Sequence, residues 1–205
     1  MNKKVILSLL GIFTAVVLLV IVGLGFSILT KPHSFNDIIT NLKEMKNYKS
    51  DITIEVANDM QKITYKGKQT CKATIGYKLE LSEGRTFIFK GDEITVKDEG
   101  IGKEYSVDKS FDEVFKYCFI GEYIGLMYTN EETNYKKENI DDKEFLLIEM
   151  LIPGSNRNLS KGVMYVSMKD NLPKKLVIYD NKDKERIVCT YENFNWTEKI
   201  EDAEF

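Results

Sequence analysis

Residues 110–128 read SFDEVFKYCFIGEYIGLMY, and this stretch decides how the chain can fold. Ser110 is followed three residues later by Glu113, a capping-box spacing that predicts the start of a helix. Apolar side chains cover nearly the whole circumference of that helix, which is typical of a segment that is buried on most sides or fills a concave sheet. Gly121 and Gly125 are expected to break it into two short helices or to mark close packing, because each glycine costs about 1 kcal/mol inside a helix.

The residues before this segment alternate between apolar and polar, which predicts half-buried antiparallel strands. The clearest runs are SDITIEVAND at 50–59, QKITYKGKQ at 61–69, GYKLELS at 76–82 and FIFKGDEITVKDEG at 87–100. Turns are expected at or near Asn58-Asp59, Gly67, Gly84 and Gly91-Asp92. About five strands therefore follow one another with no helix between them, which excludes a doubly wound parallel fold.

Strands resume after residues 129–144, TNEETNYKKENIDDKE, which are interpreted as a polar link. The later runs are FLLIEMLIPG at 145–154, VMYVSMKD at 163–170, KKLVIYD at 174–180 and RIVCTYENFNW at 186–196. Short, turn-rich connections separate them, so neighbouring strands are expected to be antiparallel.

A second helix is predicted ahead of the first strand, at residues 34–45. Ser34 and Asp37 have capping-box spacing, and apolar residues recur behind them with helical period, so one face of this helix must pack on the core. The predicted fold class is therefore α+β, with a curved antiparallel sheet, an open half-barrel of roughly nine to eleven strands, wrapped around helices.

Residues 5–29, VILSLLGIFTAVVLLVIVGLGFSIL, contain no charged side chain. A helix of this length covers roughly 37 Å, enough to span a hydrocarbon core of about 30 Å. We interpret the stretch as an uncleaved transmembrane helix, with cleavage after Gly25 or Ser27 as the alternative. Lys3 and Lys4 favour a cytoplasmic start. Residues 1–30 are thus expected to be the cytoplasmic start and single-pass anchor in the cell membrane, and residues 31–205 an extracytoplasmic domain.

Composition narrows the classes of partner. Without Lys3 and Lys4, 27 basic residues stand against 32 acidic ones, a net charge of −5. This acidic, well-mixed surface argues against nucleic acid and against tight adhesion to anionic lipid or cell-wall polymers. The three cysteines do not form a disulfide framework; one pair could be bridged, and the sequence leaves the choice open.

Motifs that would indicate an enzyme are missing from the sequence. It contains no GxGxxG, P-loop, HExxH, GxSxG or CxxC pattern, so no catalytic, cofactor-binding or metal-ligating residue is assigned. The acidic pairs Asp92-Glu93 and Asp141-Asp142 fall in turns or polar links, where consecutive side chains point apart into solvent. The chain is therefore predicted not to be an enzyme, and no cofactor is expected.

Several segments suggest a family. The KNYKS step at 46–50 and the hairpin KDNLPKKLVIYD at 169–180 resemble the LolA-like superfamily, whose fold is a curved antiparallel sheet over a hydrophobic interior plugged by helices. More specifically, the chain resembles the clostridial spore-germination lipoproteins of the GerS group. This likeness rests on FDEVFKYCFIGEYIGLMYTNEE at 111–132, IPGSNRNLSKGVMYV at 152–166 and YENFNW at 191–196.

The resemblance implies a non-enzymatic protein of spore cortex modification and germination, placed at the membrane or in the forespore or spore envelope. Members of that group bind a zinc-dependent cell-wall amidase, an N-acetylmuramoyl-L-alanine amidase, so any zinc would belong to the partner. The chain departs from the group in one respect, because it has no lipobox cysteine at the end of residues 5–29.

Two functions are compatible with these observations. A scaffold that supports an amidase predicts a well-filled interior and an exposed apolar patch or sheet edge. A LolA-like receptor or carrier for lipid or lipoprotein predicts an empty apolar cavity and a mobile helical lid. The cavity-facing candidates are Phe111, Phe115, Phe119, Tyr123 and Met127, which ordinary core packing would also explain. A fixed membrane anchor argues against a shuttle, and a homo-oligomer stays open.

Overall fold

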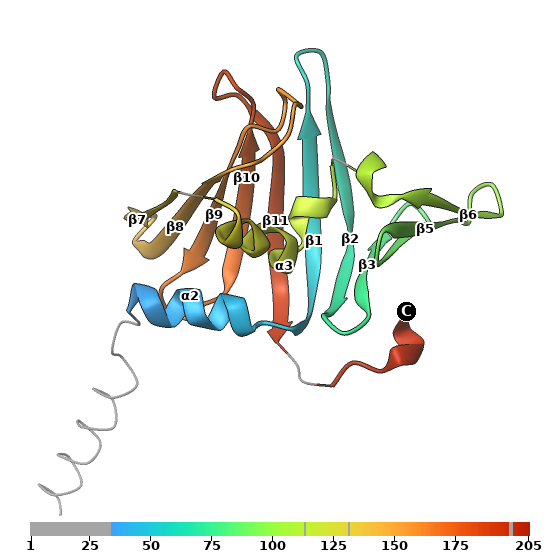
Figure 1. Cartoon of the computed structure of the whole chain (residues 1–205), viewed down its shortest axis with the longest axis horizontal. Helices are drawn as coiled ribbons and strands as arrows, with labels where there is room; N and C mark the ends of the chain where they lie inside the picture. Colours follow the sequence, from blue (N-terminus) through green and yellow to red (C-terminus); the bar gives the residue numbers. More distant parts are fainter. Residues whose placement is uncertain (1–33, 113, 131, 197–198) are drawn as a thin grey trace, which may run out of the picture. The chain divides into compact units, whose positions relative to one another are not determined.

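The computed structural model describes residues 34–112, 114–130, 132–196 and 199–205 (Figure 1). The transmembrane anchor predicted at 5–29 lies outside these residues. Within them, no helix is both long enough and apolar enough to cross a membrane.

Eleven strands in the described ranges form one sheet in which every neighbouring pair is antiparallel. The strands are β1 (Asn47–Ala57), β2 (Lys62–Lys72), β3 (Gly76–Leu81), β4 (Arg85–Lys90), β5 (Glu93–Asp98), β6 (Lys103–Asp108), β7 (Thr133–Ile140), β8 (Lys143–Leu151), β9 (Lys161–Ser167), β10 (Pro173–Tyr179) and β11 (Glu185–Trp196). Their order is β6-β5-β4-β3-β2-β1-β11-β10-β9-β8-β7, so the first and last strands meet at the centre. The predicted curved antiparallel sheet is confirmed.

Two helical segments lie on one face of this sheet (Figure 1). They are α2 (Phe35–Glu44) and a helical insert between β6 and β7, made of η1 (Lys109–Phe111), η2 (Lys116–Cys118), α3 (Ile120–Gly125) and η3 (Leu126–Tyr128). A further 3-10 turn, η4 (Asp202–Glu204), follows β11. We call residues 109–128 the insert. α2 begins as predicted, because the Ser34 hydroxyl accepts from the Asp37 amide and the Asp37 carboxylate accepts from the Ser34 amide. Its apolar stripe is buried in the same core as the insert.

Three local predictions were wrong. Gly67 lies inside β2 rather than at a turn, because β3 passes so close that an added Cβ would sit 2.2 Å from the Glu80 carbonyl oxygen. The polar link at 129–144 contains β7, an edge strand whose outward side needs no apolar residues. The α-helix of the insert begins only at Ile120, and Asp108 rather than Ser110 caps the preceding 3-10 turn.

The end of the β10–β11 hairpin is held by a buried carboxylate. Asp180 is 3% exposed, and its Oδ1 accepts from the amides of Lys182 and Lys184 at 2.7 and 2.9 Å. Its Oδ2 accepts from the Arg186 guanidinium at 2.6 Å, and the same guanidinium reaches Asp59 at the tip of the β1–β2 hairpin. These donors, the Lys184 amide first, lower the pKa of Asp180 to about 2.

Replacing Asp180 with asparagine is expected to lower the melting temperature at pH 7. A carboxylate whose pKa falls on folding stabilises the protein above the unfolded pKa of about 4, and that stability is lost as the pH falls toward 2. The gap between wild type and Asp180→Asn should therefore shrink over that range in thermal melts followed by circular dichroism.

Asp183→Asn is the matched control, because this side chain belongs to the same turn and is 80% exposed. It should change the melting temperature much less than Asp180→Asn. If the difference in melting temperature between wild type and Asp180→Asn is the same at pH 7 and pH 2, the ionised Asp180 does not stabilise the fold as described.

Candidate functional site

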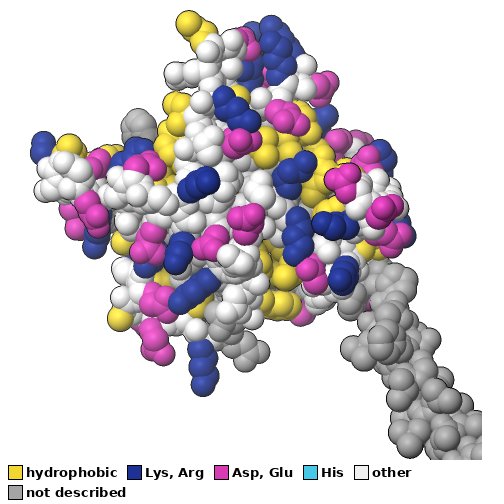
Figure 2. Space-filling model, turned by 180° about the vertical axis from the view of Figure 1, so that it is seen from behind, with side chains coloured by type: hydrophobic (Ala, Val, Ile, Leu, Met, Phe, Trp, Pro, Cys, Tyr) yellow, Lys and Arg dark blue, Asp and Glu magenta, His cyan; other side chains and the backbone are white. Residues whose placement is uncertain are grey.

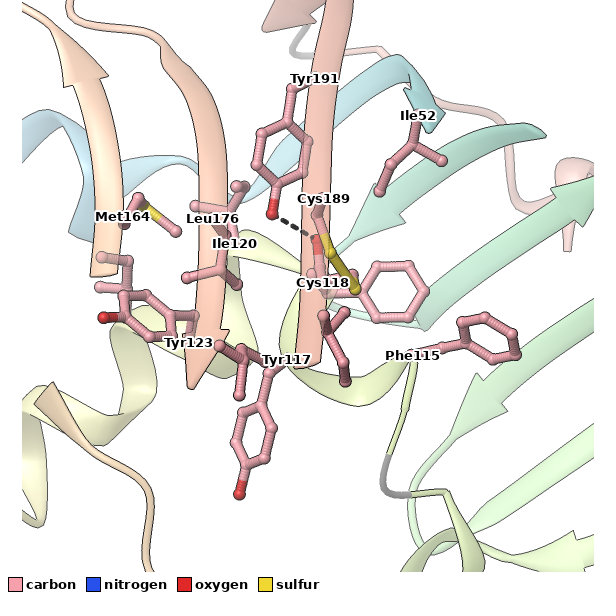
Figure 3. Close-up of a cluster of buried hydrophobic side chains, with 14 of the residues drawn as sticks. Ile52, Phe115, Tyr117, Cys118, Ile120, Tyr123, Met164, Leu176, Cys189 and Tyr191 are labelled. Atoms are coloured by element: carbon pink, nitrogen blue, oxygen red, sulfur yellow. Dashed lines mark hydrogen bonds between the residues drawn. A yellow bond between two sulfur atoms is a disulfide. The ribbon is translucent and has the colours of Figure 1, made fainter. Parts of the chain in front are cut away.

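The insert is fastened to the sheet by buried tyrosine hydroxyls. The Tyr191 hydroxyl of β11 donates to the Cys118 carbonyl oxygen at 2.9 Å (Figure 3). The Tyr48 hydroxyl of β1 accepts from the Ile120 amide at 3.0 Å, and the Tyr123 hydroxyl of the insert donates to the Ile148 carbonyl oxygen of β8 at 2.9 Å. Burial raises the pKa of all three tyrosines above the ordinary value, so the hydroxyls keep their protons.

A disulfide adds a covalent tie at the same place. Cys118 of η2 is joined to Cys189 of β11, and the two residues are separated by 71 positions in the sequence (Figure 3). The sequence left this pairing open. Cys71 stays free and is 2% exposed, and burial raises the pKa of its thiol to about 12, so it is a poor nucleophile.

Aromatic packing fills the space under the insert. Phe119 stacks on Tyr77 with ring centroids 4.7 Å apart and meets Phe89 edge-on at 5.0 Å. The Tyr123 ring lies directly on Gly162 of β9, where an added Cβ would come within 2.5 Å of the ring. The centre of the concave face is therefore a packed core.

Beside the insert, the inner face of β4–β6 stays open as a groove. Its cavity volume is about 560 Å³, and it is lined by Arg85, Phe87, Ile94, Val96, Tyr105, Val107, Ser110, Asp112, Val114 and Phe115. We call this the β4–β6 groove. Most of its lining is apolar, and a volume of this size lies within the range of small-molecule pockets.

Two charged groups reach the groove. The Arg85 guanidinium lies 5.9 Å from the ring centroids of Tyr65 and Phe87 and pairs with Glu83 at 2.6 Å. Asp112 accepts from the Val114 and Phe115 amides through Oδ1, while its buried Oδ2 has no hydrogen-bond partner within the described part of the chain. Burial raises the pKa of Asp112 despite those amides.

The predicted cavity-facing residues fall into different places. Phe115 lines the groove, Phe119 and Tyr123 are 1% and 0% exposed in the packed core, and Met127 packs partly buried against that core. The Phe111 side chain is outside the described structure. Sequence reasoning missed the groove residues of β4–β6, although their inward positions were visible in the alternation at 87–96.

The opposite face of the sheet carries both signs of charge with apolar side chains between them (Figure 2). On β8–β10, Leu147, Val163 and Val177 alternate with core residues, so they face outward, yet they are 8%, 7% and 1% exposed. Nearby lysines cover aromatic rings, with the Lys175 ammonium 4.2 Å from the Tyr165 ring centroid. Lysine stems and tyrosine rings thus cover an apolar patch on this face.

Among the residues that the structure describes, no group of three or more His, Cys, Asp or Glu side chains is close enough together to hold a metal ion.

The sequence and the fold match known proteins. The family described as sporulation protein YdcC-like matches residues 3–205. An uncharacterized conserved protein from Thermus thermophilus superposes with a TM-score of 0.55, covering 84% of this chain and 92% of its own at 9% identity. No curated protein matches the sequence.

Two further solved structures cover most of the chain. One is the CwlD amidase from Clostridioides difficile in complex with the GerS lipoprotein, with 26% identity, a TM-score of 0.49, and coverage of 82% of this chain and 99% of that chain. The other is the LolA superfamily protein NE2245 from Nitrosomonas europaea, with 13% identity, a TM-score of 0.42, and coverage of 84% and 97%.

Removing the disulfide tests how much it fixes the insert. The double variant Cys118→Ser/Cys189→Ser is expected to lose about 4 kcal/mol of unfolding free energy, because a closed loop of this length strongly restricts the unfolded chain. Denaturant titration with and without reductant measures the loss. Reductant should shift wild type toward the double variant and leave the variant unchanged.

Cys71→Ala is the control for this experiment, because Cys71 is buried but unpaired. It should keep the reductant-sensitive shift of wild type. If the denaturant midpoint of wild type is the same with and without reductant, the disulfide does not have this structural role.

Proposed function

The chain belongs to the YdcC-like family of sporulation proteins, and on that premise we propose that it is a non-enzymatic, extracytoplasmic protein that binds and supports a cell-wall amidase. The apolar stretch at 5–29 is proposed to tether it to the cell membrane by a single span, with residues 31–205 outside. The partner is proposed to be an N-acetylmuramoyl-L-alanine amidase that modifies the spore cortex.

The Cys118–Cys189 bond supports an extracytoplasmic location. Disulfides persist in oxidising compartments and are rare in the reducing cytosol. We therefore propose that the bond between Cys118 and Cys189 forms in an oxidising compartment outside the cytoplasm.

The rigid attachment of the insert is the observation that carries the scaffold function. A carrier needs a lid that moves, whereas here a disulfide and hydroxyl bonds from Tyr48, Tyr123 and Tyr191 tie the insert to β1, β8 and β11. A body of fixed shape presents a surface that needs little reordering when a partner binds.

The choice of an amidase as partner draws on the GerS resemblance. The C. difficile structure holds the CwlD amidase in complex with the GerS lipoprotein, and the identity to the matched chain is 26%. Any zinc would be supplied by the partner.

Affinity capture tests this proposal. The full chain, tagged and extracted in detergent from sporulating cells, is expected to recover a zinc-dependent cell-wall amidase, and deletion of the chain is expected to remove muramic lactam from the cortex. Cells that lack the amidase are the control for specificity. Capture of no peptidoglycan enzyme, together with unchanged cortex composition, would sink the proposal.

Lipid binding is a second candidate, favoured by the open, mostly apolar β4–β6 groove of about 560 Å³. Val107→Trp would fill the groove from its partly buried position on β6. Ser106→Trp is the matched control, because it is exposed on the same strand and faces the other side of the sheet.

If the groove holds lipid, mass spectrometry should find it with wild type and Ser106→Trp and detect about tenfold less with Val107→Trp. If the chain is an amidase scaffold, both tryptophan variants should capture the amidase as wild type does. Absence of lipid from all three proteins would remove the second candidate.

A further inference from the structure

Lysine side chains gather on the outer face at one end of β1–β4. Lys49 of β1 is in register with Thr70 of β2, Thr70 with Lys78 of β3, and Lys78 with Ile88 of β4. These four residues in register alternate along their strands with inward core residues, so their side chains point to the outer face. Lys72 of β2 and Lys90 of β4 lie on the same face, nearer the strand ends. We call the four lysines of this region the lysine row: Lys49, Lys72, Lys78 and Lys90.

Residues 199–205, KIEDAEF, lie against the lysine row. The Lys72 ammonium donates to the Ile200 carbonyl oxygen at 2.6 Å and pairs with the Asp202 carboxylate. Lys49 pairs with Glu204 at 2.5 Å, which lowers the pKa of that carboxyl. Figure 1 shows this end of the chain beside the lower ends of β2 and β3.

Apolar burial accompanies these ion pairs. Ile200 is 4% exposed, and the outward-facing Thr70 and Ile88 are 5% and 6% exposed. Phe205 is half-buried, and its carbonyl oxygen accepts from the Lys90 ammonium at 3.4 Å. Residues 199–205 are held at Lys49, Lys72 and Lys90, which lie around Thr70 and Ile88, so the segment and the lysine stems together account for this burial.

We propose that the lysine row with Thr70 and Ile88 is a binding site for an acidic peptide with apolar ends, which residues 199–205 occupy in cis. The pattern that fits is an aliphatic residue, a carboxylate two positions later, a second carboxylate two further on, and then an aromatic residue. A partner segment with this pattern would bind by displacing residues 199–205.

A partner segment can displace residues 199–205 because of the kind of contacts that hold them. They are held by side-chain and backbone-carbonyl contacts rather than by strand pairing, and the carboxylates of Asp202 and Glu204 are 80% and 31% exposed. Exposed ion pairs of this kind contribute little net stability. The cis segment therefore competes mainly through its high effective concentration.

A peptide in trans tests the site without any amidase, so the outcome is independent of the proposed function. A shortened chain, residues 1–198, is kept in detergent and mixed with the fluorescently labelled peptide KIEDAEF. Binding is followed by the fluorescence anisotropy of the peptide. It should bind the peptide about tenfold more tightly than the intact chain, whose site is filled. A peptide with both Asp202 and Glu204 replaced by their amides should bind about tenfold more weakly.

Substitutions in the shortened chain test whether the peptide binds at the lysine row. Lys72→Glu should weaken binding about tenfold, while Lys66→Glu should leave it near wild type, because Lys66 is on the same face of β2 but roughly 20 Å along the strand. Equal binding by the intact and shortened chains, or equal effects of Lys72→Glu and Lys66→Glu, would overturn the proposal. If deletion prevents folding, the full chain with Asp202→Asn/Glu204→Gln should replace it and bind the peptide more tightly than wild type.

Discussion

The attachment of the insert to the sheet is the interaction on which the rest of the structure depends. A single open sheet with alternating strands has one apolar face, and that face must be covered by another layer. The covering helices are short: α3 has six residues, fewer than an isolated helix needs to persist in water. The insert therefore takes its order from the sheet, through the Cys118–Cys189 bond and the hydroxyls of Tyr48, Tyr123 and Tyr191.

This attachment also explains why the concave face is divided. The disulfide and the tyrosine hydroxyls tie the insert to β1, β8 and β11, and Phe119 also packs on β3 and β4. The core is therefore closed over the centre of the sheet. Over β4–β6 the insert contributes Phe115 and Val114 to one wall of the groove. The buried Ile94 and Val96 of β5 line the groove as well, and the more exposed Tyr105 and Val107 of β6 complete it. A packed centre and an open flank thus both result from the way in which the insert is attached.

Much of the fold could be predicted, because inward and outward residues alternate wherever one face is buried. The alternation failed where burial is weak. β7 reads TNYKKENI and lies at an edge, so its sequence resembles a loop, and the Gly67 inside β2 resembles a turn. The disulfide could not be chosen from sequence, since only the register that brings β11 under η2 makes Cys118 and Cys189 neighbours. The groove was missed for a related reason: the strand pattern marks inward residues but does not reveal which of them a helix will cover.

The pleat of β4 has a consequence for separating the two binding surfaces. Phe87 points into the groove, while the next residue, Ile88, points to the lysine row on the other face. No side chain belongs to both surfaces, since consecutive residues of a strand point to opposite faces. A ligand in the groove and a peptide on the row can therefore bind at the same time unless one of them bends the shared strands. Coupling between the two surfaces would have to pass through the backbone of β2–β5. Within this part of the sheet, the backbones of β2 and β3 are in close contact at Gly67.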